Sequence, residues 1–151
     1  MSAKLKNEYE TDFYAWTLHN AKLVRQRKLS EIDIENIAEE LESMGKSDRR
    51  ELVNRLAILM AHLLKWQFQP NERSNSWKTT IRNQRIDVID LLDESPSLKN
   101  ELDLKLAHAY KKSVLIAMEE TKFDEKVFPK KSPYTLDQCL NSDFFPISSV
   151  D

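Results

Sequence analysis

The chain of 151 residues contains a single glycine, Gly45, which is unusual for a globular protein. Glycine normally makes up about 7% of residues, and it supplies the backbone conformations that tight turns require. Its scarcity argues against β-hairpins, phosphate-binding loops and dinucleotide-binding folds, because all of these depend on glycine. The sequence therefore points to helices.

Cysteine is also scarce, and long hydrophobic runs are missing. Cys139 is the only cysteine, so an intramolecular disulfide is excluded and a reducing compartment fits. No uninterrupted apolar run reaches the roughly 18 residues of a membrane helix. Residues 1–10 lack the apolar run of a secretory signal. We therefore expect a cytoplasmic protein that does not associate with membranes.

The overall composition is that of one globular domain. Charged residues make up 32% of the chain and hydrophobic residues 40%, which is ordinary for a folded protein. The net charge of −2 gives no overall attraction to nucleic acid. We expect a flexible N-terminus over 1–10, a helical bundle over 11–122 and a C-terminal strap over 123–151 packed on the bundle.

The organising element is a helix expected from Ser47 to Gln69, where Pro70 restricts the residue before it. At about 100° per residue its apolar positions cover more than half of the circumference, so other helices must cover it on several sides. The residues of its main stripe are Leu52, Leu56, Leu59, Leu63 and Trp66.

Four further helices and a short one complete the predicted all-α, single-domain bundle of about five helices. They begin at Thr11 or Asp12, after the N-cap Ser30, near Trp77, after Ser95-Pro96 and at Ser132-Pro133. They end near Arg27, Met44, Glu94, Thr121 and Leu140. Gly45 is expected in the left-handed conformation that ends a helix, and Ser47 then caps the central helix. Asn20 is expected to be a hydrogen-bonded core amide.

The C-terminal strap is rich in aromatic residues, which favours an ordered segment over a disordered tail. We expect its apolar side chains to pin it to the bundle. These are Phe128, Tyr134, Leu136, Phe144 and Phe145.

Charge alternates along the chain. Residues 30–45 contain six acids and no base, residues 46–85 nine bases and three acids, and residues 86–104 six acids and one base. We favour ion pairs between neighbouring helices as the explanation. The alternative is nucleic-acid binding through the basic segment, whose side chains would be Arg49, Arg50, Arg55, Lys65, Arg73, Lys78, Arg82 and Arg85.

Several polar residues interrupt the apolar faces of the helices. If the central and returning helices pack antiparallel, most of them gather at one end of the bundle. This candidate polar cluster consists of Glu39, Glu40, His62, Gln69, Arg73, Gln84 and Arg85. It could be a small-ligand or metal-dependent enzyme site, but a buried network that fixes helix register is the interpretation we favour.

The histidine spacing does not support a metal centre. Metal-binding bundles use Glu-x-x-His on one helix, whereas His19, His62 and His108 lie on three different predicted helices, and none follows an acid by three or four residues. No nucleophile-elbow motif locates a Ser/His/Asp site. We therefore assign no catalytic residue, no metal ligand and no cofactor.

Several blocks resemble a bacterial family known as domain of unknown function twenty-nine. They are DFYAW at 12–16, NIAEELESMG at 36–45, HLLKWQFQP at 62–70, RSNSW at 73–77, TIRNQR at 80–85, SPSL at 95–98 and SPYTL at 132–136. The resemblance spans Asp12 to Phe145. It implies a compact all-helical domain without an established activity, and it supplies no catalytic residues; of the three histidines, only His62 lies in a block.

These observations favour a non-enzymatic protein-binding or regulatory module that is able to self-associate. A protein partner fits the alternating charge of the helices and the lack of a catalytic constellation. The enzyme or ligand site around His62, Gln69, Gln84 and Arg85, and nucleic-acid binding through residues 46–85, are the alternatives.

Overall fold

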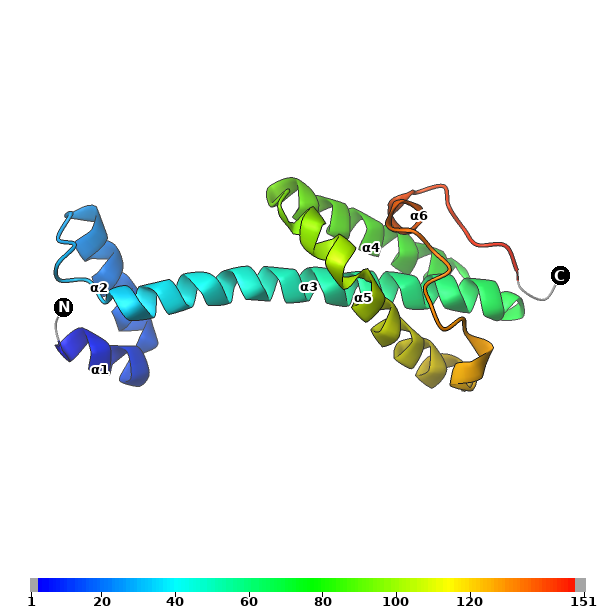
Figure 1. Ribbon diagram of the computed structural model, residues 1–151, viewed down its shortest axis with the longest axis horizontal. Coiled ribbons are helices and arrows are strands. Elements are labelled where there is room, and N and C mark those ends of the chain that lie inside the picture. Colours follow the sequence, from blue (N-terminus) through cyan, green and yellow to red (C-terminus); the bar gives the residue numbers. More distant parts are fainter. Residues whose placement is uncertain (1–2, 149–151) are drawn as a thin grey trace. The chain divides into compact units, whose positions relative to one another are not determined.

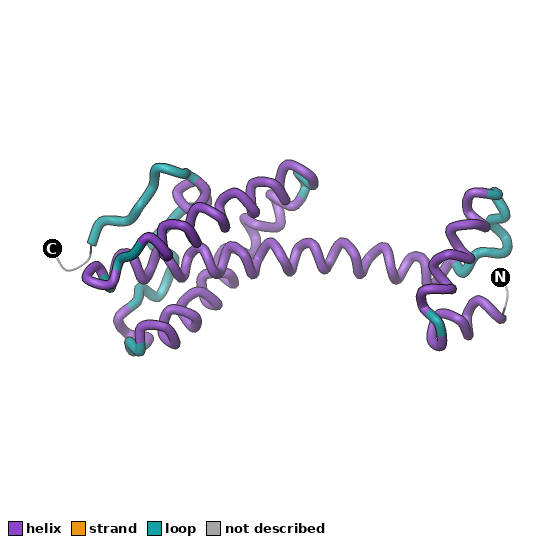
Figure 2. Tube along the Cα trace, turned by 180° about the vertical axis from the view of Figure 1, so that it is seen from behind, coloured by secondary structure: helices purple, strands orange, loops and turns teal. Residues whose placement is uncertain are grey.

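The computed structural model describes residues 3–148, and within that range it contains six α-helices and no strand (Figure 1). The predicted all-α class is confirmed. Figure 2 shows that short loops connect the helices and that longer loops flank α6. Residue contacts divide the chain into two compact units, one ending at Ser47 and one beginning at Asp48. We describe each unit by itself.

The first unit begins with a helix that the sequence analysis did not anticipate. Residues 3–11, expected to be flexible, form α1 (Ala3–Thr11). Leu5 is buried, and the Tyr9 ring makes an edge contact with Trp16 at 4.8 Å between centroids. Because Leu5 is the only buried residue among the described residues of α1, its apolar pattern is too sparse to be recognised in the sequence. Residues 1–2 lie outside the described range.

The second helix, α2 (Phe13–Arg25), follows its sequence signals closely. Asp12 is the N-cap, and its carboxylate accepts a hydrogen bond from the backbone of Ala15 at 3.1 Å. Asn20 is buried and fully engaged, as predicted. Its Nδ2 donates to the carbonyl of Trp16, and its Oδ1 accepts from the backbone N–H of Asp33, both at 2.9 Å. Asn20 therefore ties α2 to the residue that precedes the next helix.

The third helix, α3 (Ile34–Phe68), is one continuous helix of 35 residues. The predicted helix end at Gly45 is therefore wrong, as are the caps at Ser30 and Ser47. Local signals misled the prediction, since glycine and serine also occur inside helices. Gly45 has a helical backbone, and a Cβ added there would meet no atom within 4 Å.

Buried polar contacts hold the start of α3. Asp33 is fully buried, and its Oδ2 accepts hydrogen bonds from Trp16 Nε1 at 3.0 Å and from Asn36 Nδ2 at 2.7 Å. Burial acts to raise the pKa of Asp33, but these hydrogen bonds outweigh it and hold the pKa below its ordinary value. The charged carboxylate thus fixes where α3 begins.

Because Gly45 lies inside a helix with open space around it, Gly45→Ala should raise the free energy of unfolding by about 0.5–1 kcal/mol. The gain comes from the reduced backbone entropy of the unfolded chain. Urea denaturation followed by circular dichroism measures it. The matched variant Ser47→Ala should not lose the roughly 1 kcal/mol that removing a helix cap costs. A destabilised Gly45→Ala protein would indicate a helix end at this position.

The second unit contains the rest of α3 together with α4 (Asn75–Glu94), α5 (Leu98–Thr121) and α6 (Leu136–Leu140). Two short 3₁₀ helices, η1 (Pro70–Glu72) and η2 (Glu125–Val127), lie in the connections. Figures 1 and 2 show α4 and α5 beside the C-terminal half of α3. The predicted stripe forms the core, since Leu52, Leu56, Leu59 and Leu63 have no exposed surface. Trp66 is half-buried against them.

Two of the helix starts predicted for the second unit, at Ser95 and at Ser132, are wrong. Of the two serines before Trp77, Ser74 and Ser76, it is Ser74 that caps α4, accepting from the backbone of Trp77 at 3.2 Å. Ser95 ends α4 instead of starting the next helix, and α5 begins at Leu98. The start of α6 is not at Ser132, because the capping box that begins it joins Thr135 to Gln138. The predicted ends of α5 and α6 are correct.

In the described part of the strap, residues 123–148, the predicted apolar side chains pack on the bundle. Phe128, Tyr134 and Leu136 are buried in the core cluster, and the side chains of Phe144 and Phe145 pack against it. The Tyr134 hydroxyl donates to Gln67 Oε1 at 2.7 Å. The strap thus completes the core of the second unit. Residues 149–151, the end of the predicted strap, lie outside the described range.

Candidate functional site

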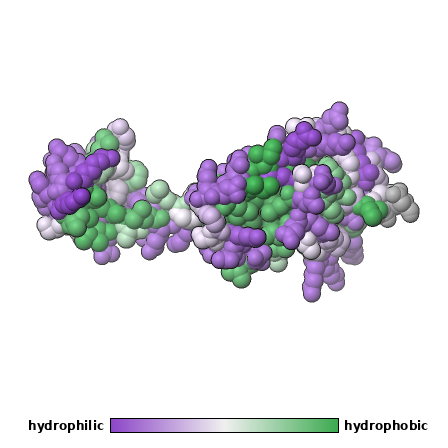
Figure 3. All heavy atoms as spheres, turned by 90° about the horizontal axis from the view of Figure 1, so that it is seen from above, coloured by the Kyte–Doolittle hydropathy of each residue, from purple (hydrophilic) through white to green (hydrophobic). Residues whose placement is uncertain are grey.

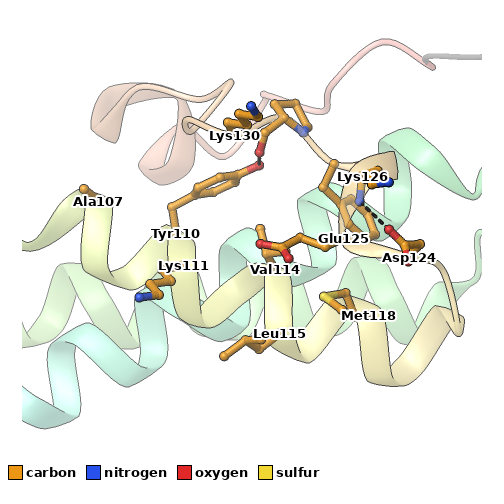
Figure 4. Close-up of a pocket in the computed structure, with 12 residues that line it drawn as sticks. Ala107, Tyr110, Lys111, Val114, Leu115, Met118, Asp124, Glu125, Lys126 and Lys130 are labelled. Atoms are coloured by element: carbon orange, nitrogen blue, oxygen red, sulfur yellow. Dashed lines mark hydrogen bonds between the residues drawn. The ribbon is translucent and has the colours of Figure 1, made fainter.

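A groove with a volume of about 880 Å³ lies in the second unit, between α5 and the segment that follows it (Figure 4). We call it the α5 groove. Helix α5 supplies apolar side chains over three turns, and residues 124–130 form the opposite wall. Its lining residues are Ala107, Tyr110, Lys111, Val114, Leu115, Met118, Asp124, Glu125, Lys126, Phe128, Pro129 and Lys130.

Two local features build the wall of the α5 groove. Helix α5 ends at Lys122, whose left-handed conformation (φ 63°) turns the chain back along the helix. The Tyr110 hydroxyl then donates to the carbonyl of Pro129 at 2.6 Å and ties the returning segment to α5. Between these points, Asp124 caps η2 by accepting from the backbone of Lys126 at 2.9 Å. The hydrogen bonds of Tyr110 and Asp124 therefore fix the position of the segment that forms the second wall of the groove.

The lining of the α5 groove is partly apolar and partly charged. Leu115 is one of the lining residues, and 60% of its surface is exposed. Lys111, Lys126 and Lys130 stand at the rim (Figure 4), and within residues 3–148 none of the three forms an ion pair. The groove thus combines apolar side chains with three lysines and two acids, Asp124 and Glu125.

Sequence reasoning missed the α5 groove because it treated α5 as a one-faced helix. Leu104 and Leu115 are apolar residues that the sequence places in no predicted core. Single exposed leucines are common on protein surfaces. Only the backbone path after Lys122 shows that residues 124–130 form a second wall beside α5. The lysines between 122 and 131 were a weak signal that the prediction did not use.

Within the predicted polar cluster, Arg85 has a structural role. Its guanidinium, 3% exposed, donates to the carbonyls of Cys139 and Phe144 at 2.7 Å each and to that of Gln138 at 3.3 Å. Burial lowers its pKa from the ordinary value. The strap supplies these backbone carbonyls at and after the end of α6, where helices carry partial negative charge. Arg85 clamps the strap to α4.

Arg73 and Gln69 lie near the end of α3. Arg73 Nε donates to the carbonyl of Trp66 at 2.8 Å, and its guanidinium lies 4.8 Å from the centroid of the Trp66 ring. The ring of Phe145 lies 4.8 Å from the same indole. Gln69 is half-buried and precedes η1. These contacts close the α3–α4 turn.

His62 and Gln84 are half-buried at separate places. The Nδ1 of His62 lies 2.9 Å from the carbonyl of Ile58, and burial lowers its pKa, so the ring is neutral near pH 7. Gln84 has a buried Oε1 without a hydrogen-bond partner in the described part of the chain. Across that same part, no hydrogen bond or ion pair joins any two of His62, Gln69, Arg73, Gln84 and Arg85. A ligand site there stays a prediction.

Glu39 and Glu40 belong to the first unit. Glu40 accepts a hydrogen bond from the Tyr9 hydroxyl, which raises the pKa of Tyr9 to about 12. Glu39 is exposed. Each of the two carboxylates is therefore accounted for within its own unit.

The residues weighed for metal or nucleophilic chemistry are also accounted for. His19 Nδ1 lies 2.8 Å from Glu8 Oε2 on an exposed surface. In the range 3–148, no three His, Cys, Asp or Glu side chains are grouped so that they could hold a metal ion. Cys139 is buried, and burial raises the pKa of its thiol to about 12. This thiol is protonated and inert at neutral pH.

Ion pairs engage several side chains of the basic segment. Arg55 reaches Asp87 on α4 at 2.8 Å, Lys65 reaches Glu120 on α5 at 3.0 Å, and Arg49 reaches Glu101 on α5 at 3.6 Å. These contacts are the helix-to-helix pairs that alternating charge predicts. No helix between residues 3 and 148 is long and apolar enough to cross a membrane.

Comparison with known protein families shows to which family the chain belongs. Residues 8–145 match the family described as "Domain of unknown function DUF29". The chain belongs to this family. The DUF29 match begins inside α1 and ends at Phe145, so it includes the α5 groove and nearly all of the strap. No curated protein and no solved structure matched the chain.

A second surface of this DUF29 chain lies on the first unit. The start of α3 exposes apolar residues at helical spacing, which we call the α3 stripe: Ile34, Ala38, Leu41 and Met44. The exposed fractions of Ile34, Leu41 and Met44 are 58%, 63% and 64%. Figure 3 shows hydrophobic residues at the surface of this unit, next to hydrophilic ones. A pocket of about 340 Å³ between α2 and α3 adjoins the stripe at Leu41.

Proposed function

We propose that this protein is a non-enzymatic protein-binding module and that the α5 groove is its binding surface. The observation that carries the proposal is the combination of apolar lining side chains, exposed at Leu115, with three lysines that form no ion pair in the described chain. A groove of this kind suits an amphipathic helix, whose apolar side chains recur every three or four residues.

The lysines at the rim of the groove favour a partner with negative charge. Lys111, Lys126 and Lys130 favour carboxylates next to the partner's apolar face, since opposite charges at a binding rim speed association and disfavour wrong partners. The partner segment is therefore an acidic amphipathic helix. Asp124 and Glu125 also line the groove, so attraction depends on the lysines that lie nearest the ligand.

The remaining residues support a binding role over catalysis. Arg85 serves the strap, and the Cys139 thiol is buried and protonated. Ion pairs occupy Arg49, Arg55 and Lys65 of the basic segment, which argues against nucleic-acid binding through it. We place the protein in the bacterial cytoplasm, in keeping with its single cysteine.

A designed helical peptide tests the groove. The probe has leucine at every third or fourth position and glutamate elsewhere, carries a fluorophore, and is titrated with the full chain while anisotropy is recorded. We expect saturable binding that weakens as salt rises, because exposed charge pairs are screened. Leu115→Asp should weaken binding at least tenfold, since it places a carboxylate among the apolar contacts of an acidic ligand.

The matched control is Leu104→Asp, which changes an exposed leucine (78%) on the same helix outside the groove lining. It should bind like the wild type. A peptide with lysine in place of glutamate should bind at least tenfold more weakly. Equal binding of both peptides, or equal loss in both leucine variants, contradicts the proposal. Binding of a fatty acid but of neither peptide would assign the groove to a small anionic amphiphile instead.

A further inference from the structure

We infer that the acidic helix that occupies the α5 groove is the start of α3 from a second copy of this chain. The inference rests on the proposed function of the groove and names its partner. It would make the interface head-to-tail, because the α3 stripe and the α5 groove are different surfaces.

The α3 stripe has the apolar character that the groove requires. Ile34, Leu41 and Met44 expose more than half of their surface, and Ala38 is exposed between them. They recur at intervals of three and four residues and so share one side of the helix. Within the first unit this side of α3 is uncovered. Exposed apolar surface with regular helical spacing is typical of helices that bind in grooves.

The lengths of the two surfaces agree. From Ile34 to Met44 the helix advances ten residues, or about 15 Å at 1.5 Å per residue. The α5 side of the groove runs from Ala107 to Met118, eleven residues, or about 16 Å by the same measure. The α3 stripe therefore fills the groove from end to end.

The charges are complementary. Residues 30–45 carry six acids and no base, whereas residues 122–131 carry four lysines and two acids. Glu35, Glu39 and Glu42 are exposed along one flank of the α3 stripe. In a groove-bound helix this flank would face lysines at one side of the groove. A parallel pairing of two α3 stripes would instead place like charges together, which disfavours the symmetric arrangement.

A head-to-tail contact leaves one free stripe and one free groove in every pair of copies, so further copies can add until a ring closes. The interface is a single short helix, which places it among weak, transient contacts. We therefore expect association in the micromolar range that increases with protein concentration and decreases with salt.

Two single variants of the full chain test the inference by complementation. Leu41→Asp removes the stripe and leaves the groove, and Leu115→Asp removes the groove and leaves the stripe. Each alone should self-associate at least tenfold more weakly than the wild type in sedimentation velocity. Mixed together, they should form a complex of one copy of each that does not grow further, because only one intact stripe and one intact groove remain.

Leu104→Asp is the matched control and should assemble like the wild type. The inference is overturned if the wild-type chain stays monomeric at all concentrations, if the mixture shows no complex, or if both variants assemble normally. Its failure is separable from that of the proposed function. A monomeric chain that still binds the glutamate-rich peptide through Leu115 retains the binding groove and loses only the second copy as its partner.

Discussion

Replacing Arg85 with alanine should lower the free energy of unfolding by about 2–5 kcal/mol, because it leaves buried carbonyls without donors. The wild-type guanidinium donates to Cys139 and Phe144 at 2.7 Å each, and to Gln138 and Ser142 at longer distances. Urea denaturation measures the loss. Because these contacts hold α6 and the residues after it, the strap should detach before the rest of the second unit unfolds.

The thiol of Cys139 reports on this detachment directly. It is the only cysteine, and the wild-type strap buries it. In Arg85→Ala it should react much faster with a thiol reagent under native conditions. Arg82→Ala, an exposed position on the same helix, is the control and should change stability by less than about 0.5 kcal/mol. Unchanged thiol reactivity in Arg85→Ala would mean that the aromatic contacts alone hold the strap.

Leu63→Ala should lower the free energy of unfolding by about 2–5 kcal/mol, because it opens a cavity in the middle of the second unit. Leu63 has no exposed surface and belongs to the core cluster formed by α3, α4, α5 and the strap. Neighbouring helices can relax only partly into the vacated volume, since protein interiors are close-packed. Equilibrium unfolding in urea gives the value.

Leu104→Ala controls for the leucine-to-alanine change itself. Leu104 is 78% exposed on α5, so the substitution should stay within about 0.5 kcal/mol of the wild type. A loss below about 1 kcal/mol for Leu63→Ala would be the size of a surface effect and would contradict the assigned core.

The core of the second unit could be predicted because a single physical signal specifies it. The leucines of α3 repeat at helical spacing on more than one side, and such a helix can only be stable when covered. The same reasoning placed Phe128, Tyr134 and Leu136 in the core, where the structure has them. For the starts of α2 and α4 the sequence left two cap residues open each, and the structure selects Asp12 and Ser74, whose side chains bond the next turn.

The full length of α3 could not be predicted, because residues that commonly end and start helices occur in its middle. Glycine commonly ends a helix and serine commonly starts one, as Gly45 and Ser47 would. Nothing in the sequence indicates that one helix continues past both residues. Residues 41–48 are exposed in the helix, so no apolar pattern bridges the break. For Arg85, the sequence gives burial between apolar neighbours but not its acceptors, which lie more than 50 residues away in the strap.

The candidate site shows the same limit more strongly. Each residue of the α5 groove is ordinary in the sequence, and the groove exists only because Lys122 reverses the chain and Tyr110 fastens it to Pro129. The predicted polar cluster, in contrast, was proposed from one helix pairing. Its members in the second unit have local partners such as Ile58 for His62 and Trp66 for Arg73.

The most direct test of the central claim is to map where an acidic helix binds. Uniformly ¹⁵N-labelled full chain is titrated with an unlabelled peptide of residues 31–44, and the backbone amide shifts are followed by NMR. We predict that the shifts concentrate on α5 between Ala107 and Met118 and on residues 124–130, with little change elsewhere. Shifts that concentrate on other residues would contradict the assignment of the α5 groove as the binding surface, and no shifts at the highest peptide concentration would overturn the start of α3 as its occupant.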